Sequence, residues 1–171
     1  MTTALYLLLV LGLLGAFDTL WYHEYQQQLP RNASARTELR LHAARDFAYA
    51  IVFGSLGWAL WHGLLAWLFF AILLFEIGIT LWDFIEEDIT RRLPAGERVM
   101  HTVMAIVFGA FLAHLLPQVF NWAGEDSTRL VPVRYGLLSW ALSVFAIGVF
   151  LSGVRDVIAS FRLPEQASSP G

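Results

Sequence analysis

Residues 64–92 read LLAWLFFAILLFEIGITLWDFIEEDITRR. The run before Glu76 is entirely apolar, and from there Glu76, Asp83 and Glu87 recur at helical spacing on one face. A helix of this length can cross about 30 Å of hydrocarbon. It would carry ionisable side chains into that layer, where unpaired charge is costly. The stretch therefore predicts a membrane-spanning helix with one functional face.

Apolar runs of similar length recur along the chain, separated by short polar or Pro/Gly-containing connections. We predict an all-α integral membrane protein in which residues 1–162 form a single transmembrane bundle. The tail, residues 163–171, is rich in Pro and Ser and is expected to be disordered. The five expected helices cover residues 3–25, 35–61, 64–92, 97–117 and 131–161.

Composition narrows the classes of function. The chain has 171 residues, of which 57% are hydrophobic, and a formal net charge of −3. That charge does not favour nucleic acid as a partner, whereas the lipid bilayer is an expected one. The absence of cysteine excludes disulfides, thiolate metal sites and iron–sulfur clusters.

Arginine placement predicts the orientation. Arginines are concentrated at the first and third connections and at the end of the last helix, and the second connection has none. By the positive-inside rule, the N-terminus lies outside and the C-terminus lies in the cytoplasm, as in a bacterial inner-membrane protein. An odd number of spans, such as five, is required to place the two termini on opposite sides.

Two segments of the sequence look duplicated. Thr19-Leu20-Trp21 recurs as Thr80-Leu81-Trp82, and the block AIVFG occurs at residues 50–54 and again at 105–109. We expect helices one–two and three–four to be parallel repeats, related by a pseudo-two-fold axis along the membrane normal, with a fifth helix added. Aligning on AIVFG places His42 opposite Glu97 and Asp46 opposite His101.

Helical spacing sorts the ionisable residues into stripes. Glu38, His42 and Asp46 share one face of the second helix, and Glu97 and His101 are four residues apart on the fourth. The first helix offers Asp18. If that helix is straight, His23 points elsewhere.

Depth argues for a bound cation. Counted from the outer helix ends at about 1.5 Å per residue, Asp18, Asp46, Glu76 and His101 lie roughly 18–24 Å inward, and further groups lie one level below. Carboxylates crowded at such depths need protonation, pairing or a metal. The candidate ligands are Asp18, His42, Asp46, Glu76, Asp83 and His101, with Glu38, Glu87 and Glu97 as further ligands or supporting groups.

Oxygen and nitrogen ligands without sulfur suit one or two divalent ions, with Fe preferred and Mn or Zn as alternatives. Four-helix bundles build dinuclear centres from inward-facing carboxylates and histidines. We therefore expect a membrane-embedded metalloprotein with a dinuclear, Fe-type centre near the cytoplasmic side. Its expected activity is that of an oxidoreductase acting on a lipophilic small molecule.

Three alternatives use the same residues differently. The carboxylates could carry protons or metal cations, or form a structural salt-bridge network around Arg45. Paired histidines, either His42 with His101 or His62 with His114, could instead hold a haem in the helical bundle. In all of these interpretations Arg91 belongs to a solvated extension of the third helix.

Overall fold

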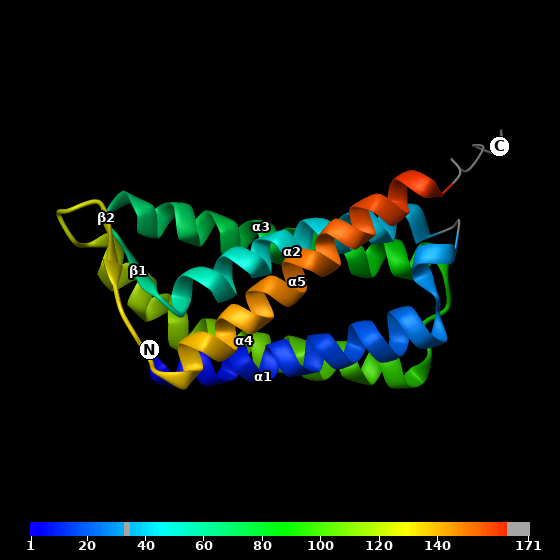
Figure 1. The fold of residues 1–171 in the computed structure, drawn as a ribbon, viewed down its shortest axis with the longest axis horizontal. Coiled ribbons are helices and arrows are strands. Elements are labelled where there is room, and N and C mark those ends of the chain that lie inside the picture. Colours follow the sequence, from blue (N-terminus) through cyan, green and yellow to red (C-terminus); the bar gives the residue numbers. More distant parts are fainter. Residues whose placement is uncertain (33–34, 164–171) are drawn as a thin grey trace.

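The computed structural model describes residues 1–32 and 35–163. The tail predicted for residues 163–171 lies, from residue 164 onward, outside the described residues. Most of the described chain is helical, with two short strands (Figure 1). In chain order the elements are α1 (Thr2–Asp18), the π-helix η1 (Thr19–Gln26), the 3₁₀ turn η2 (Leu29–Arg31), α2 (Arg36–Leu56), β1 (Ala59–His62), α3 (Leu64–Thr90), α4 (Ala95–Ala123), β2 (Arg129–Pro132) and α5 (Leu137–Arg162).

The long helices form an all-α bundle. α1 lies beside α4, α4 packs on α3, and α3 packs on α2 (Figure 1). α5 runs obliquely along α2 and also touches α1. The N-terminus and the two strands lie at one end of the bundle, and the last turn of α5 lies at the other.

The end near the N-terminus holds the apolar core. Leu5, Leu8, Phe69, Phe111 and Leu115 are all fully buried there, from α1, α3 and α4. Close van der Waals contact among such side chains is what holds apolar helix faces together in a lipid environment. This apolar core sets the spacing of the helices, which continue from it toward the end of the bundle that holds the C-terminus.

Four helical segments within the described residues are long and apolar enough to cross a membrane: Thr2–Gln26, Leu64–Thr90, Ala95–Ala123 and Leu137–Arg162. α2 is not among them. Its sequence carries Glu38, Arg40, Arg45 and Asp46 within three turns, and this charge lowers its hydropathy.

The second helix was predicted to run to Trp61, but it ends at Leu56. β1 follows it and pairs antiparallel with β2, so that Trp61 lies opposite Leu130. Gly63 then turns the chain with φ +62, and its N–H donates to the carbonyl of Trp122. A Cβ at Gly63 would lie 2.7 Å from Thr128 Oγ1, so the turn requires glycine.

Two further boundaries differ from the prediction. α4 was expected to end at Pro117 but continues to Ala123 with the proline inside it. Proline removes one N–H donor without forbidding the helix, and Phe111, Leu115 and Val119 keep that segment packed in the core. The last helix was expected from Val131, but that residue belongs to β2 and α5 begins at Leu137.

Candidate metal centre

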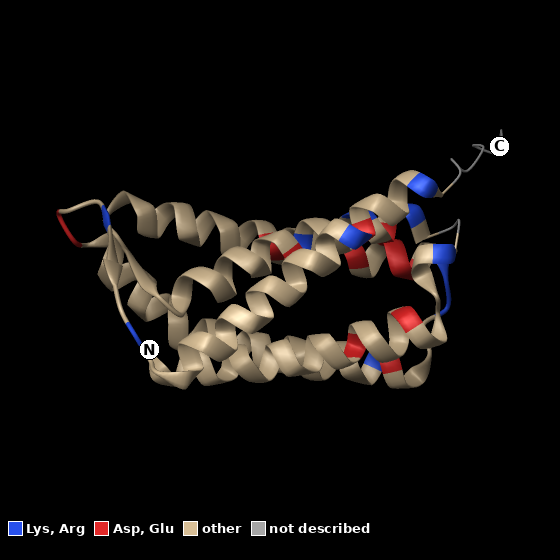
Figure 2. Cartoon of the chain, viewed as in Figure 1, with Lys and Arg blue, Asp and Glu red and all other residues tan. Residues whose placement is uncertain are grey.

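The acidic residues and arginines gather toward the end of the bundle that holds the C-terminus, while long stretches of the helices near the other end carry none (Figure 2). Four helical segments each send two ligand-type side chains into this polar half. Asp18 and His23 come from α1 and η1, Glu38 and His42 from α2, Asp83 and Glu87 from α3, and Glu97 and His101 from α4. We call these eight residues the polar cluster.

Helical periodicity explains three of these pairs. In α2, α3 and α4 the paired residues are four apart, so they lie on the same face one turn from each other. All of these side chains except His101 are buried, with exposed fractions of 0–3%. A row of buried ionisable groups on three facing helices requires compensation by partners inside the bundle.

The fourth pair depends on a local change of helix type. Asp18 and His23 are five residues apart, and in a continuous α-helix the histidine would point away, as predicted. The chain instead forms a π-helix over Thr19–Gln26, whose i→i+5 pattern places residues five apart on one face. His23 Nε2 therefore lies 3.3 Å from Asp18 Oδ2, and His23 is 4% exposed. The straight helix that the prediction for His23 assumed is therefore not present, and His23 joins the cluster.

The distances within the cluster are those of side chains that could share a cation. His101 Nε2 lies 3.4 Å from Asp18 Oδ2, and His42 Nε2 lies 3.0 Å from Asp83 Oδ2. His23 Nε2 lies 3.6 Å from Glu97 Oε1. Two ligands held about 2.0–2.2 Å from one ion, at tetrahedral or octahedral angles, are separated by about 2.8–3.6 Å.

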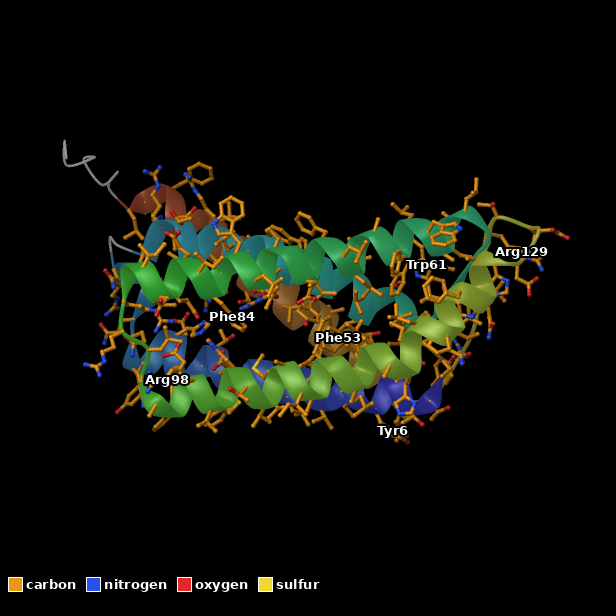
Figure 3. All side chains as sticks on the ribbon, turned by 180° about the vertical axis from the view of Figure 1, so that it is seen from behind. Tyr6, Phe53, Trp61, Phe84, Arg98 and Arg129 are labelled. Carbon is orange, nitrogen blue, oxygen red and sulfur yellow. The ribbon has the colours of Figure 1, made fainter. Side chains whose placement is uncertain are left out.

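Aromatic contacts pack the histidines. The rings of His23 and His42 stack with centroids 4.6 Å apart, and Phe84 stacks on His101 at 5.5 Å. Figure 3 shows Phe84 and Arg98 at the end of the bundle opposite Trp61 and Arg129. The stacked faces fix the ring planes and leave the ring nitrogens facing carboxylates.

Two groups of ligand atoms are close enough to hold an ion. The first comprises His23, Glu87, Glu97 and His101, and the second Glu38, His42 and Glu87, with all atoms of a group within 4.8 Å of one another. Glu87 belongs to both groups, so its two oxygens could bridge two ions. Asp18 and Asp83 each contact a histidine of the cluster, where a carboxylate can orient the ring.

Several polar atoms of the cluster are buried without a hydrogen bond to any described residue. Three carboxylate oxygens are in this position, namely Asp18 Oδ1, Asp83 Oδ1 and Glu87 Oε2. Burying such an atom unsatisfied costs about 1–3 kcal/mol. A bound cation would give these three oxygens the partner that the described residues do not supply.

Arg91 is the main cation that the described residues offer the cluster. Its Nη2 lies 2.8 Å from Glu38 Oε1, 3.1 Å from Glu87 Oε1 and 2.7 Å from Glu97 Oε1. Burial alone would lower the pKa of Arg91, but the hydrogen bonds to Glu97 and Glu38 raise it above its ordinary value. From the sequence, Arg91 was expected in a solvated extension, because it follows the charged run after Asp83 and no spacing rule marks it.

Two of the predicted ligands, Asp46 and Glu76, lie outside the polar cluster. Glu76 accepts a hydrogen bond from Thr80 at 2.9 Å within α3. Asp46 lies beside α5, where a Cβ at Gly153 would lie 3.2 Å from the Cβ of Asp46. Arg45 lies between these residues and the cluster, and its Nη1 bonds Asp83 Oδ2 at 3.0 Å. The seven other predicted ligands all lie in the polar cluster.

Two hollows reach the cluster from different sides. One, of about 870 Å³, is lined by α3, α4 and the chain between them and includes Glu87, Arg91 and His101. The other, of about 510 Å³, lies among α1, α2 and α5 and includes Asp18 and Arg45. The walls of both are mainly apolar, and charged residues make up a larger share of the first.

Comparison with known proteins identifies no relative of this chain. No protein-family model matches the chain, and neither a curated protein nor a solved structure matches it. The residues of the polar cluster and their geometry are therefore the whole basis for a function.

Proposed function

We propose that the chain spans a membrane with five helices, α2 included, with its N-terminus outside and its C-terminus in the cytoplasm. Four helical segments have the required length and composition. Large apolar side chains such as Leu81, Ile106 and Val144 are 58–68% exposed on the outer faces of the bundle, as lipid-facing residues are. α2 packs against α3 and α5, which would shield its charges from lipid.

We propose that the polar cluster holds a dinuclear metal centre. The observation that carries this proposal is that four helical segments each bring two ligand-type side chains to one buried place, with Glu87 common to two groups. Its five carboxylates face two guanidiniums, Arg45 and Arg91, so the cluster keeps an excess of negative charge while its histidines are neutral. Divalent cations would neutralise that excess.

Iron is the metal that we propose, since carboxylate-rich sites with few histidines are typical of dinuclear iron in four-helix bundles. Manganese and zinc use the same ligand types. Bound iron would supply one-electron and O₂ chemistry. This chain would contribute the carboxylates and histidines, exclude bulk water by burying them, and hold a lipophilic substrate nearby, which makes it a membrane oxidoreductase.

Anaerobic loading with Fe(II), followed by exposure to O₂, tests this function. The purified protein should bind about two Fe(II) per chain, take up O₂, and give the Mössbauer signature of two magnetically coupled ferric ions. A spectrum of isolated high-spin iron would rule out the dinuclear centre. Iron that does not react with O₂ would rule out the oxidoreductase.

The ion pairs of Arg91 favour a second candidate, a structural membrane subunit. A guanidinium that bonds three carboxylates at 2.7–3.1 Å can hold α2, α3 and α4 together without metal. The contacts of Arg91 do not include Asp18 or the three histidines, which is why we rank this candidate second. Metal retention during purification separates the two candidates.

We also propose that the two helical hairpins, α1–α2 and α3–α4, are repeats. The ligand residues that correspond in the two repeats are offset by one helical turn from the residues that the sequence match aligns. The AIVFG blocks align His42 with Glu97, but in the cluster Glu38 and His42 hold the same helical spacing as Glu97 and His101. A four-residue shift is about one helical turn, so it preserves the face. Superposing α1–α2 on α3–α4 should then overlay Glu38 on Glu97.

A further inference from the structure

The hollow among α1, α2 and α5 is not needed to hold a metal, yet its polar end touches the cluster. Its volume of about 510 Å³ lies within the range of about 300–1,000 Å³ that is usual for small-molecule sites. The walls are mainly apolar and include Leu11, Phe53, Val144, Phe145 and Leu151. On α1 and the start of η1 the lining extends from Leu11 to Leu20, about 13 Å along a helix.

The two ends of this cavity differ. Near Gly12 it is closed, because a Cβ there would lie 2.9 Å from Phe145 Cδ1 and 3.0 Å from Phe53 Cζ. A Cβ at Gly148 would meet nothing within 4 Å, and one at Gly15 only Met104 Cε at 3.8 Å. The space therefore opens beyond the two rings, toward the level of Asp18.

Both arginines at the polar end are already engaged. Arg45 bonds Asp83 at 3.0 Å, and Arg155 bonds Asp156 at 2.7 Å and also pairs with Glu24. An anionic or cationic headgroup would have to displace one of these partners. A neutral polar headgroup would not.

One carboxylate oxygen at this end has no hydrogen-bond donor. Asp18 lines the cavity and is 2% exposed. Its Oδ2 faces His23 and His101, while its Oδ1 has no hydrogen-bond donor among the described residues. A hydroxyl group placed beside it would satisfy that oxygen.

We propose that this cavity binds a long-chain amphiphile with a neutral hydroxyl headgroup, the hydrocarbon lying along α1 and α5 and the hydroxyl donating to Asp18. That the bound amphiphile is the substrate of the metal centre rests on the proposed function. That the cavity binds such an amphiphile rests on the cavity alone. Because α1 and α5 are both apolar enough to face lipid, the ligand enters sideways from the bilayer.

Photolabelling in lipid vesicles tests the proposal. The probe is a long-chain primary alcohol with a diazirine in mid-chain, and the labelled peptides are identified by mass spectrometry. Labelling of residues 11–20 and 144–151 should saturate, and excess unlabelled alcohol should abolish it. The alkane and the carboxylate of equal chain length should compete about tenfold less well, a difference of about 1.4 kcal/mol. Labelling that is spread over all lipid-facing helices and does not saturate would overturn the proposal.

Glycine variants supply a matched control. Gly148→Phe should fill the cavity and reduce saturable labelling about tenfold, or 1.4 kcal/mol, and Gly15→Leu should do the same from α1. Gly109→Phe, at a position on α4 that also has nothing within 4 Å but lies outside the cavity, should label like the wild type. Labelling of Gly148→Phe and Gly15→Leu at the wild-type level would contradict the site.

Metal content, measured on the same samples, keeps the two proposals apart. Saturable labelling of wild-type protein that holds no metal would remove the metal centre and leave the lipid site. Metal-loaded protein without saturable labelling would do the reverse. The glycine variants should retain the wild-type metal content, because none of these glycines touches the cluster.

Discussion

Arg91 and a metal ion would compete for the same oxygens. The guanidinium bonds Glu38, Glu87 and Glu97, and both candidate ligand groups include carboxylates from this set. If metal occupies the cluster, the carboxylates no longer depend on Arg91. If no metal is bound, Arg91 is their main counter-charge.

We therefore expect Arg91→Gln to behave differently with and without metal. In chelator-treated protein the substitution leaves buried carboxylates without their cation and should cost about 3–5 kcal/mol. In metal-loaded protein it should cost much less and strengthen metal binding. Thermal unfolding of both forms measures this, with the exposed neighbour Arg92→Gln as the control. An equal loss of stability in the two forms would support a purely structural ion-pair cluster.

At the residue scale the sequence predicted most of the polar cluster. The i,i+4 spacing on α2, α3 and α4 identified Glu38, His42, Asp83, Glu87, Glu97 and His101, and depth identified Asp18. Asp46 was included because the count treated every helix as upright, whereas α2 is inclined in the bundle (Figure 1). Glu76 shares a face of α3 with Asp83 but lies seven residues, about two turns, before it and so outside the cluster. Arg91 was missed because its contacts run across the connection to α2 and α4, which no local pattern encodes.

The π-helix is the element on which the fourth ligand pair depends. It places His23 beside Asp18 across five residues, and the sequence has no proline or glycine within Thr19–Gln26 that would mark it. A sequence pattern interpreted at 3.6 residues per turn cannot reveal a local change to the π form. The wider spacing is retained by contacts of His23 with Asp18 and His42.

Deleting one residue from each of two helices tests this role. Without Leu20, Asp18 and His23 become four residues apart, and an ordinary α-helix keeps them on one face, so metal content should persist. Without Ile85, Glu87 rotates by about 100° relative to Asp83, and metal content should fall sharply. Leu20 and Ile85 are similarly exposed, at 66% and 61%, so lost lipid contact is matched. If both deletions lose metal alike, the π-helix has no special role.

Element boundaries were predicted well where they depend on local sequence. α3 begins after Gly63 and ends near Arg91, as predicted from the apolar run and the charges that follow it. The β1–β2 pair was missed, since Ala59–His62 and Arg129–Pro132 are far apart in the chain and only the folded bundle brings them together. Pro117 was given too much weight as a helix terminator.

At the scale of the whole molecule, the proposed topology can be read with single cysteines, because the chain has none of its own. We expect Glu125→Cys, in the connection before β2, to react with a membrane-impermeant maleimide in intact cells. Ala95→Cys, at the start of α4, should react only after lysis. Both positions are exposed, so accessibility is matched. The opposite labelling pattern would show the inverse orientation.

The most direct test of the metal centre is a metal count on detergent-purified protein expressed with iron available. Wild-type protein should hold about two ions per chain after dialysis. Glu87→Gln removes the carboxylate shared by both groups and should reduce the count to about one or none, whereas the adjacent, exposed Asp88→Asn should keep the wild-type count. Wild-type protein that retains no metal, or a Glu87→Gln variant that retains all of it, would contradict the proposed centre.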